Sequence, residues 1–386
     1  MQRITTRERQ DWKNLANMLG FKFHTIDGDL YWDESAYYRF TLNQVEKDIE
    51  DPTEEIHQMC MDLVDRAVSD EVMLKRLRIP ELHWDHIRDS WNRRDKHLYG
   101  RMDFSYNGKG PAKFLEYNAD TPTSLYESAF FQWVWLEQCI ERGLLPANCD
   151  QYNSIQEHMI EAFAQINPPQ PLYFACCKDT DEDRGTVQYM EDCAVQAGLK
   201  TKFIYIDDIG VSPDGQFTDL EGYTIPSLFK LYAWEWLMTE EYGSFIPNSD
   251  TWFIEPAWKS ILSNKSILPL LWELHPNHPN LLPSYFEDEQ RNISTHSGWV
   301  KKPIFSREGS NISVVVDGNV CERVDGPYDD SGYILQSYAP LPKFGDSYTV
   351  IGSWVVADRP CGMSVREDNS VITKDSSRYL PHVILD

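Results

Sequence analysis

Apolar residues recur at helical spacing between residues 43 and 95. Two runs within this segment, 56–68 and 82–91, carry apolar side chains three or four positions apart, which places them on one face of a helix. The residues that define the two faces are Ile56, Met59, Leu63 and Val64 in the first run, and Leu82, His83, Ile87 and Trp91 in the second. The segment is therefore predicted to be rich in helix, with a break at Pro80.

The pattern changes to that of strands after residue 97. The stretches 98–106 and 112–119 flank Asn107-Gly108, a dipeptide typical of tight turns. We therefore predict a β-hairpin here. Pro122 then begins a predicted helix that ends at Gly143.

The rest of the chain predicts a mixed α/β (α+β) protein. Strands at 171–177 and 201–210 enclose a helix at 184–197, which indicates a βαβ unit and a parallel sheet. A polar break at 263–265 interrupts a helical stretch, and strands dominate from residue 298 onwards. We expect three parts, which need not be continuous in sequence: 1–165, helical and containing the hairpin; 166–295, an α/β part; and 296–386, a nucleotide-binding part.

Composition excludes some classes of partner. Asp and Glu outnumber Lys and Arg by 61 to 36, and the resulting charge of −25 would repel nucleic acids and anionic membranes. This acidity would attract a cationic partner such as a polyamine, or it serves only solubility. Neither a signal peptide nor a membrane-spanning stretch is evident, and the eight cysteines form no CxxC pair. A cytoplasmic protein with reduced thiols and no obligate protein partner is expected.

The predicted hairpin gathers polar side chains. Alternation puts Arg101 and Asp103 on one face of the first strand, and Glu116 and Asn118 on one face of the second. Folding about residues 107–110 sets the two pairs nearly opposite each other. One interpretation is a cross-strand salt bridge on an exposed hairpin. The other is a Mg²⁺ site, because Asp, Glu and an Asn oxygen are hard ligands and an Arg beside them suits a phosphate.

Other segments offer partners for an anion. The predicted helix after Thr121 would present free backbone N–H groups, and Lys265 and Lys302 lie in or beside predicted turns and strands. The second lysine leads into the small-residue loop 306–312. The sequence contains neither a Walker P-loop nor a GxGxxG fingerprint, so a nucleotide would need a different fold.

The sequence resembles the synthetase part of glutathionylspermidine synthase, a member of the ATP-grasp ligases. The segments that carry the resemblance are RMDF (101–104), EYNAD (116–120), EPAWKSILSNKSILPLLW (255–272), VKKPIFSREGSNI (300–312), LPK (341–343) and VREDNSVITK (365–374). The resemblance implies an ATP-grasp fold with a pre-ATP-grasp-like domain and a helical N-terminal part. It also implies an ADP-forming acid–amine ligase that uses ATP and Mg²⁺ to join a small peptide or glutathione-like acid to an amine, such as a polyamine, through an acyl phosphate.

The resemblance assigns roles to individual residues. Asp103, Glu116 and Asn118 would hold Mg²⁺, and Arg101 would face the phosphates or the acyl phosphate. The nucleotide would be held by Lys265, Lys302, the loop residues Glu308 and Gly309, and an adenine-side hinge of Gln336, Ser337, Tyr338 and Ala339. Arg366 would approach the transferred phosphoryl group. Thr121 would occupy the place of a substrate-contacting Ser, while Glu182 and Asp183 either meet the amine or are a solvated first turn of a helix.

Departures from the family pattern keep alternatives open. The chain has no room for the amidase domain of the bifunctional members, so a stand-alone synthetase that does not hydrolyse its product is expected. Leu231 replaces a Thr expected near the peptide substrate. The alternatives are a nucleotide- or peptide-binding protein that lost turnover and a phosphotransferase that stops at the acyl phosphate.

Overall fold

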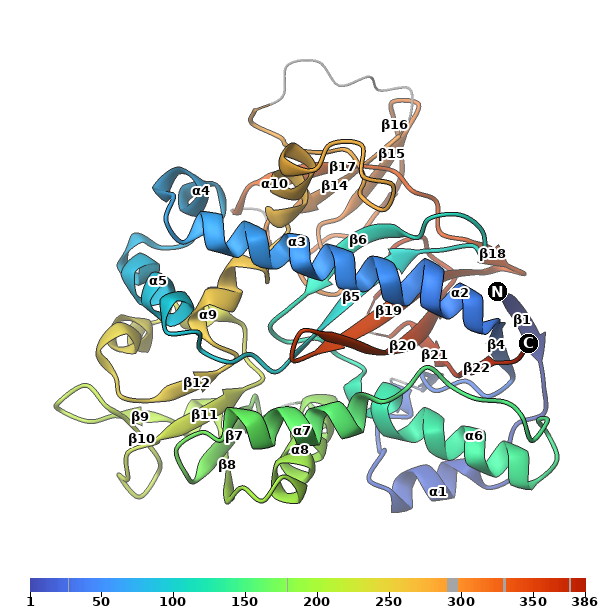
Figure 1. Ribbon diagram of the computed structural model, residues 1–386, viewed down its shortest axis with the longest axis horizontal. Coiled ribbons are helices and arrows are strands. Elements are labelled where there is room, and N and C mark those ends of the chain that lie inside the picture. Colours follow the sequence, from blue (N-terminus) through green and yellow to red (C-terminus); the bar gives the residue numbers. More distant parts are fainter. Residues whose placement is uncertain (27, 179, 290–297, 329–330, 375) are drawn as a thin grey trace.

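An antiparallel sheet lies at the centre of the molecule (Figure 1). The computed structural model describes residues 1–386 apart from 27, 179, 290–297, 329–330 and 375. The central sheet has the order β21–β20–β19–β5–β6, with β18 paired to β19. Its strands are β5 (Tyr99–Ser105), β6 (Lys113–Asn118), β18 (Lys343–Phe344), β19 (Ser347–Val356), β20 (Arg359–Asp368) and β21 (Arg378–Leu380). Segments from the first third and from the last part of the chain therefore build one sheet.

Two further large sheets flank the centre. The antiparallel one has the order β13–β17–β14–β15–β16 and consists of β13 (Ser284–Phe286), β14 (Trp299–Pro303), β15 (Ser313–Val316), β16 (Asn319–Arg323) and β17 (Tyr333–Ser337). The parallel one has the order β12–β11–β7–β8 and consists of β7 (Leu172–Cys176), β8 (Thr201–Tyr205), β11 (Ser227–Lys230) and β12 (Trp252–Ile254). The predicted βαβ unit is confirmed, because α8 (Asp181–Gln196) joins the parallel pair β7 and β8.

Smaller sheets complete the strands. β1 (Gln2–Thr5), β4 (Ala36–Phe40) and β22 (His382–Ile384) bring the two chain ends together (Figure 1). Two-stranded ribbons are formed by β2 (Thr25–Ile26) with β3 (Asp29–Leu30), and by β9 (Gly210–Val211) with β10 (Phe217–Thr218). The remaining α-helices are α1 (Trp12–Met18), α2 (Leu42–Val45), α3 (Asp51–Ala67), α4 (Glu71–Arg76), α5 (Trp84–Asn92), α6 (Gln132–Glu141), α7 (Ile155–Ile166), α9 (Trp234–Leu237) and α10 (Ile267–Leu274).

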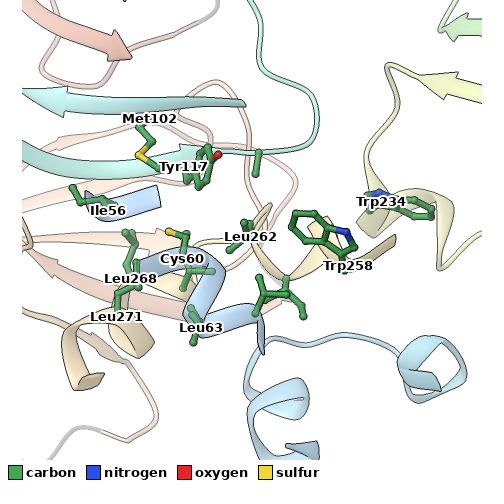
Figure 2. Close-up of a cluster of buried hydrophobic side chains, with 14 of the residues drawn as sticks. Ile56, Cys60, Leu63, Met102, Tyr117, Trp234, Trp258, Leu262, Leu268 and Leu271 are labelled. Carbon is green, nitrogen blue, oxygen red and sulfur yellow. The ribbon is translucent and has the colours of Figure 1, made fainter. Parts of the chain in front are cut away.

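The long helix α3 covers one face of the central sheet. Its buried side chains include Ile56 and Cys60, which share a core with Met102 of β5 and Tyr117 of β6 (Figure 2). Burial of such apolar surface stabilises the helix far more than its intrinsic propensity does. The predicted helical region 43–95 is confirmed, but Leu82 is 59% exposed, because it lies in the 3₁₀ turn Glu81–His83 rather than in a continuous α-helix.

The helix predicted to begin at Pro122 starts three residues later, at Leu125. Ser124 has a φ of 67°, a left-handed conformation that a helix cannot run through. The helix continues through a π-helical turn, Glu127–Phe131, into α6. Its predicted end is confirmed, since Gly143 has a φ of 67° just beyond α6.

The expected three-part division stays a prediction. The boundary expected at 295/296 lies outside the described residues. Because β5 pairs with β19, the first and last parts share one sheet, and any division of the chain there is discontinuous. Six of the eight cysteines are buried, the exceptions being the half-buried Cys177 and the exposed Cys321.

Candidate active site

The predicted hairpin brings the four polar residues together. β5 and β6 pair with Arg101 opposite Asn118 and Asp103 opposite Glu116. The Asn118 side-chain amide donates hydrogen bonds to Asp103 Oδ2 at 3.2 Å and to Glu116 Oε1 at 3.4 Å. The predicted convergence is confirmed, and the exposed-hairpin interpretation is wrong, because Arg101 and Asp103 are only 6% and 9% exposed.

Arg101 makes a two-pronged ion pair with Asp103. Its Nε donates to Asp103 Oδ1 at 2.7 Å and its Nη2 donates to Asp103 Oδ2 at 2.9 Å. Burial alone would lower the pKa of Arg101, but the attraction of Asp103 outweighs it and raises the pKa. Each carboxylate oxygen has two lone pairs, so Asp103 keeps capacity to bind a metal beside this pair. Two carboxylates and an amide therefore fit a hard divalent cation.

The two predicted lysines approach the same carboxylates. Lys265 Nζ lies 3.4 Å from Glu116 Oε2 and donates to the Ser306 carbonyl at 2.8 Å. Lys302 Nζ donates to the Leu115 carbonyl at 3.0 Å. Burial would raise the pKa of Glu116, but Lys265 and Lys302, with smaller effects of Arg101 and Asn118, lower it to about 2. Glu116 is thus an anion at neutral pH.

One cavity unites these groups with the predicted nucleotide residues. It is lined by Asp103, Glu116, Asn118, Lys265, Lys302, Glu308, Gly309 and the segment from Gln336 to Ala339. Apolar side chains of Val300, Ile312, Val314, Leu341, Val350 and Ile372 line the same cavity. The arrangement has a charged end and an apolar end, which suits a molecule with a phosphate chain and a flat ring. Gln336 itself donates to the Phe114 carbonyl at 3.2 Å, so its side chain is held within the protein.

A second cavity continues from the charged end. Arg101, Arg366, Thr121, Glu308 and Gly309 line it together with Thr373 and Lys374, as do the hairpin acids. Arg366 is buried on β20, and its Nη2 donates to the Lys374 carbonyl at 2.5 Å and to the Ser377 carbonyl at 3.3 Å. The two predicted catalytic arginines therefore face one space, beside the proposed metal ligands.

The structure does not bring Glu182 and Asp183 into the two cavities described above. They occupy the first turn of α8, and the cavities described above are lined by other residues. Burial raises the pKa of Asp183, while a hydrogen bond from Thr180 and the charge of Arg307 act in the opposite direction. The role of Glu182 and Asp183 as amine contacts stays a prediction.

Arg307 is a site residue that the sequence reasoning missed. Its guanidinium donates to the Thr121 hydroxyl and, at 2.8 Å, to Glu235 Oε1. Burial disfavours its charge, but Glu235 outweighs this effect and raises the pKa of Arg307. Arg307 lines both cavities described above, next to Glu308. Its position inside SREGSN, beside two residues already assigned to the loop, was the available signal.

A buried ion pair, also missed, fixes the end of the hairpin segment. Lys230 Nζ lies 2.8 Å from Asp120 Oδ1, and both side chains are almost fully buried. Asp120 Oδ2 also accepts the Trp234 backbone N–H at 2.8 Å. Leu231, the residue that departs from the family pattern, packs in the neighbouring apolar core. The Asp120 contacts hold the chain between Asn118 and Thr121 against the parallel sheet.

Comparison with known proteins identifies the family. The family model described as glutathionylspermidine synthase preATP-grasp matches residues 3–385. The chain belongs to this family. The family resemblance seen in the sequence and the mixed α/β, pre-ATP-grasp type of fold are thereby confirmed.

Curated relatives of the family support the same class of enzyme. A Haemophilus influenzae protein named "Putative acid--amine ligase" is 39% identical, with 99% of each chain covered. Trypanothione synthetase of Crithidia fasciculata is 27% identical over 83% of this chain and 52% of its own length. The bifunctional glutathionylspermidine synthetase/amidase of Escherichia coli is 28% identical over 92% of this chain and 60% of its own length. The expected class, a carbon–nitrogen ligase, is confirmed at the level of the family.

A solved structure supports the fold. A glutathione synthetase-like effector from Globodera pallida has a TM-score of 0.58 to this chain, with 98% of each chain covered and 11% identity.

Among the described residues, no helix is both long enough and apolar enough to span a membrane.

Proposed function

We propose that this family member is an ATP- and Mg²⁺-dependent acid–amine ligase that works through an acyl phosphate. The observation that carries the proposal is the single cavity in which two carboxylates and an amide meet Lys265 and Lys302 beside an apolar slot. Lysines and a divalent cation together suit a polyphosphate chain, and the slot between β14, β15 and residues 336–339 suits an adenine ring. Asp103, Glu116 and Asn118 would hold Mg²⁺, which would offset the charge of the phosphate oxygens.

The arginines would serve the chemical steps. A carboxylate oxygen of the acid substrate attacks the γ-phosphorus of ATP, the bond to ADP breaks, and an acyl phosphate forms. The amine then attacks the carbonyl carbon, phosphate leaves with the bonding electrons, and the nitrogen loses a proton. Two anions must approach each other in the first step, so the charges of Arg101 and Arg366 would lower its barrier. Their shared cavity beside Asp103 supports this assignment.

The substrates are proposed by class. Thr121 and Arg307 form a hydroxyl and guanidinium pair that would contact the carboxylate of a small peptide or glutathione-like acid. Glu182 and Asp183 would attract a cationic amine such as a polyamine, which the net charge of −25 also favours. We infer that the protein acts on small molecules.

The substitution Glu116→Gln tests the metal site. With Mg²⁺ present, the variant should bind ATP far more weakly than the wild type, because a charged metal ligand becomes neutral. With chelator in place of Mg²⁺, it should bind ATP at least as tightly, because a negative charge near the phosphates is gone. Titration calorimetry in both conditions measures the two affinities.

A matched control separates this effect from general loss of charge. Glu287 pairs with Lys301 at 2.6 Å and is 43% exposed, so Glu287→Gln removes a carboxylate–lysine pair whose two members do not line the cavity. It should leave both affinities unchanged. Equal Mg²⁺-dependent affinity in Glu116→Gln and wild type would show that Glu116 is not a metal ligand.

Turnover is tested by phosphate release with ATP, short peptides and amines. The ligase requires that amine stimulates release and that amide appears in step with ADP. ADP formation with a stable phosphorylated acid and no response to amine would favour the phosphotransferase. Mg–ATP binding without release would favour a binding protein.

A further inference from the structure

Two histidines and an aspartate converge on the face of the central sheet opposite the candidate active site. His57 Nε2 lies 2.8 Å from Asp358 Oδ1, and His97 Nε2 lies 2.7 Å from the same oxygen. The three ligand atoms lie within 4.8 Å of one another. His57 and His97 are 3% and 7% exposed, whereas the Asp358 side chain is 61% exposed. The cluster is therefore buried on one side and open to water on the other.

Its three members come from separate segments. His57 belongs to α3, His97 precedes β5, and Asp358 is in the turn between β19 and β20. The Ala357 N–H donates to the Leu98 carbonyl at 2.9 Å, which pins the turn beside His97. Ala357 and Asp358 have φ angles of 46° and 68°, a left-handed conformation that is unfavourable for residues other than glycine. In this turn the Asp358 carboxylate contacts both imidazoles.

We propose that His57, His97 and Asp358 bind a divalent transition-metal ion of the Zn²⁺ class. Imidazole nitrogens with one carboxylate are ligands for such ions, whereas Mg²⁺ prefers oxygen alone. Tetrahedral Zn²⁺ places its ligand atoms about 3.3 Å apart, so the exposed Asp358 carboxylate would move outward and the two imidazole nitrogens would adjust to admit the ion. Water would supply the fourth ligand from the open side.

The second ring nitrogen of His57 has a hydrogen-bond partner, as is usual for a histidine that binds a metal. This nitrogen, Nδ1, lies 3.1 Å from the Tyr117 hydroxyl. A ligating histidine usually donates from its other nitrogen to such a partner, which fixes the ring. Tyr117 lies between Glu116 and Asn118 on β6, and alternation along the strand points it to the opposite face, toward α3 (Figure 2). The site is therefore separate from the proposed Mg²⁺ ligands and independent of the ligase proposal.

Metal titration of the metal-free protein tests the proposal. Excess Mg²⁺ should first be added to fill the oxygen site, followed by Co²⁺ as a spectroscopic probe and by Zn²⁺ in competition. One equivalent of Co²⁺ should give the strong visible absorption of a tetrahedral ion, and Zn²⁺ should abolish it. Asp358→Asn and His97→Gln should each weaken the affinity on the order of 100-fold, and Tyr117→Phe by about 10-fold.

The control is another histidine–carboxylate pair. His278 Nε2 lies 3.3 Å from Glu55 Oε1, so His278→Gln removes one imidazole outside the cluster and should leave Co²⁺ binding unchanged. Asp358→Asn keeps an exposed residue that tolerates the left-handed conformation, so its fold should persist even if His97→Gln does not fold. Absence of a tetrahedral spectrum in the wild type, or equal Co²⁺ affinity in Asp358→Asn, would overturn the proposal and leave a hydrogen-bonded clamp.

Discussion

Lys302 carries its charge in a poorly hydrated position. The residue is 6% exposed, and burial lowers the pKa of its ammonium group to about 8, although Glu116 and Asp103 attract it. Lys265 repels it and adds to the decrease. A group with this pKa is mostly charged at pH 7 and mostly neutral at pH 9. The ability of the site to hold an anion should therefore depend on pH within this range.

Mg–ATP affinity should fall about tenfold between pH 7 and pH 9, because a lysine with a pKa of about 8 goes from about 90% to about 10% charged. Lys302→Arg keeps its charge throughout and should flatten the profile. Calorimetric titrations at fixed ionic strength measure both profiles. Parallel profiles for the two proteins would exclude Lys302 as the titrating group.

Single residues differ in how far sequence could predict them. The register of Asp103 against Glu116 is set by a short turn, so local pattern was sufficient. Lys265 and Lys302 meet Glu116 across more than 140 residues of chain. Local pattern marked them only as possible partners for an anion, and the family resemblance assigned them to the nucleotide. No local pattern marks Arg307, because its partners Thr121 and Glu235 lie 186 and 72 residues away in the sequence. The same holds for Lys230 and Asp120, which are 110 residues apart.

The loop between β14 and β15 is the element that bounds both active-site cavities. Glu308 and Gly309 have φ angles of 55° and 72° there. A Cβ added at Gly309 would lie 2.6 Å from Ile372 Cγ2 and 2.8 Å from the Thr373 carbonyl oxygen. The loop therefore packs directly on the segment after β20, which also lines the cavities.

Gly309→Ala should weaken Mg–ATP binding, because the new methyl group pushes the loop away from residues 372–373. Gly318→Ala is the matched control, since Gly318 has a φ of 77° but nothing within 4 Å of the added Cβ. Both variants carry a similar cost for the left-handed backbone, on the order of 1 kcal/mol. The difference between their ATP affinities measures the effect of the contact between the added methyl group and residues 372–373. Equal affinities would show that the position of the loop does not control ATP binding.

Elements were predicted best where a local signal fixes them. The strands from 298 onwards and the βαβ unit follow from alternation and turn residues. The helix start at Leu125 was missed because no local signal marks the left-handed conformation of Ser124, whose hydroxyl lies 2.9 Å from that of Tyr31, 93 residues away. Pairing of β5 with β19 joins segments about 250 residues apart, which no local pattern reveals.

The stability of the whole molecule depends on pH through the buried histidine His382. His382 on β22 is fully buried beneath the junction of the two chain ends, and its Nε2 accepts the Tyr152 backbone N–H at 3.2 Å. Burial lowers the pKa of His382 from 6.5 to about 3. The unfolded chain therefore binds a proton below pH 6.5 that the folded chain refuses until about pH 3, so folding stability must fall across this window.

Between pH 7 and pH 5, His382 alone should lower the free energy of unfolding by about 2 kcal/mol, because the unfolded imidazole is charged at pH 5 and the folded one is still neutral. His382→Gln keeps a hydrogen-bond acceptor for Tyr152 and does not titrate, so its stability should depend less on pH by this amount. Urea unfolding followed by tryptophan fluorescence at both pH values gives the difference. The control is His278→Gln, because His278 is half-buried and pairs with the exposed Glu55. If His382→Gln loses as much stability as the wild type, acid sensitivity arises elsewhere in the molecule.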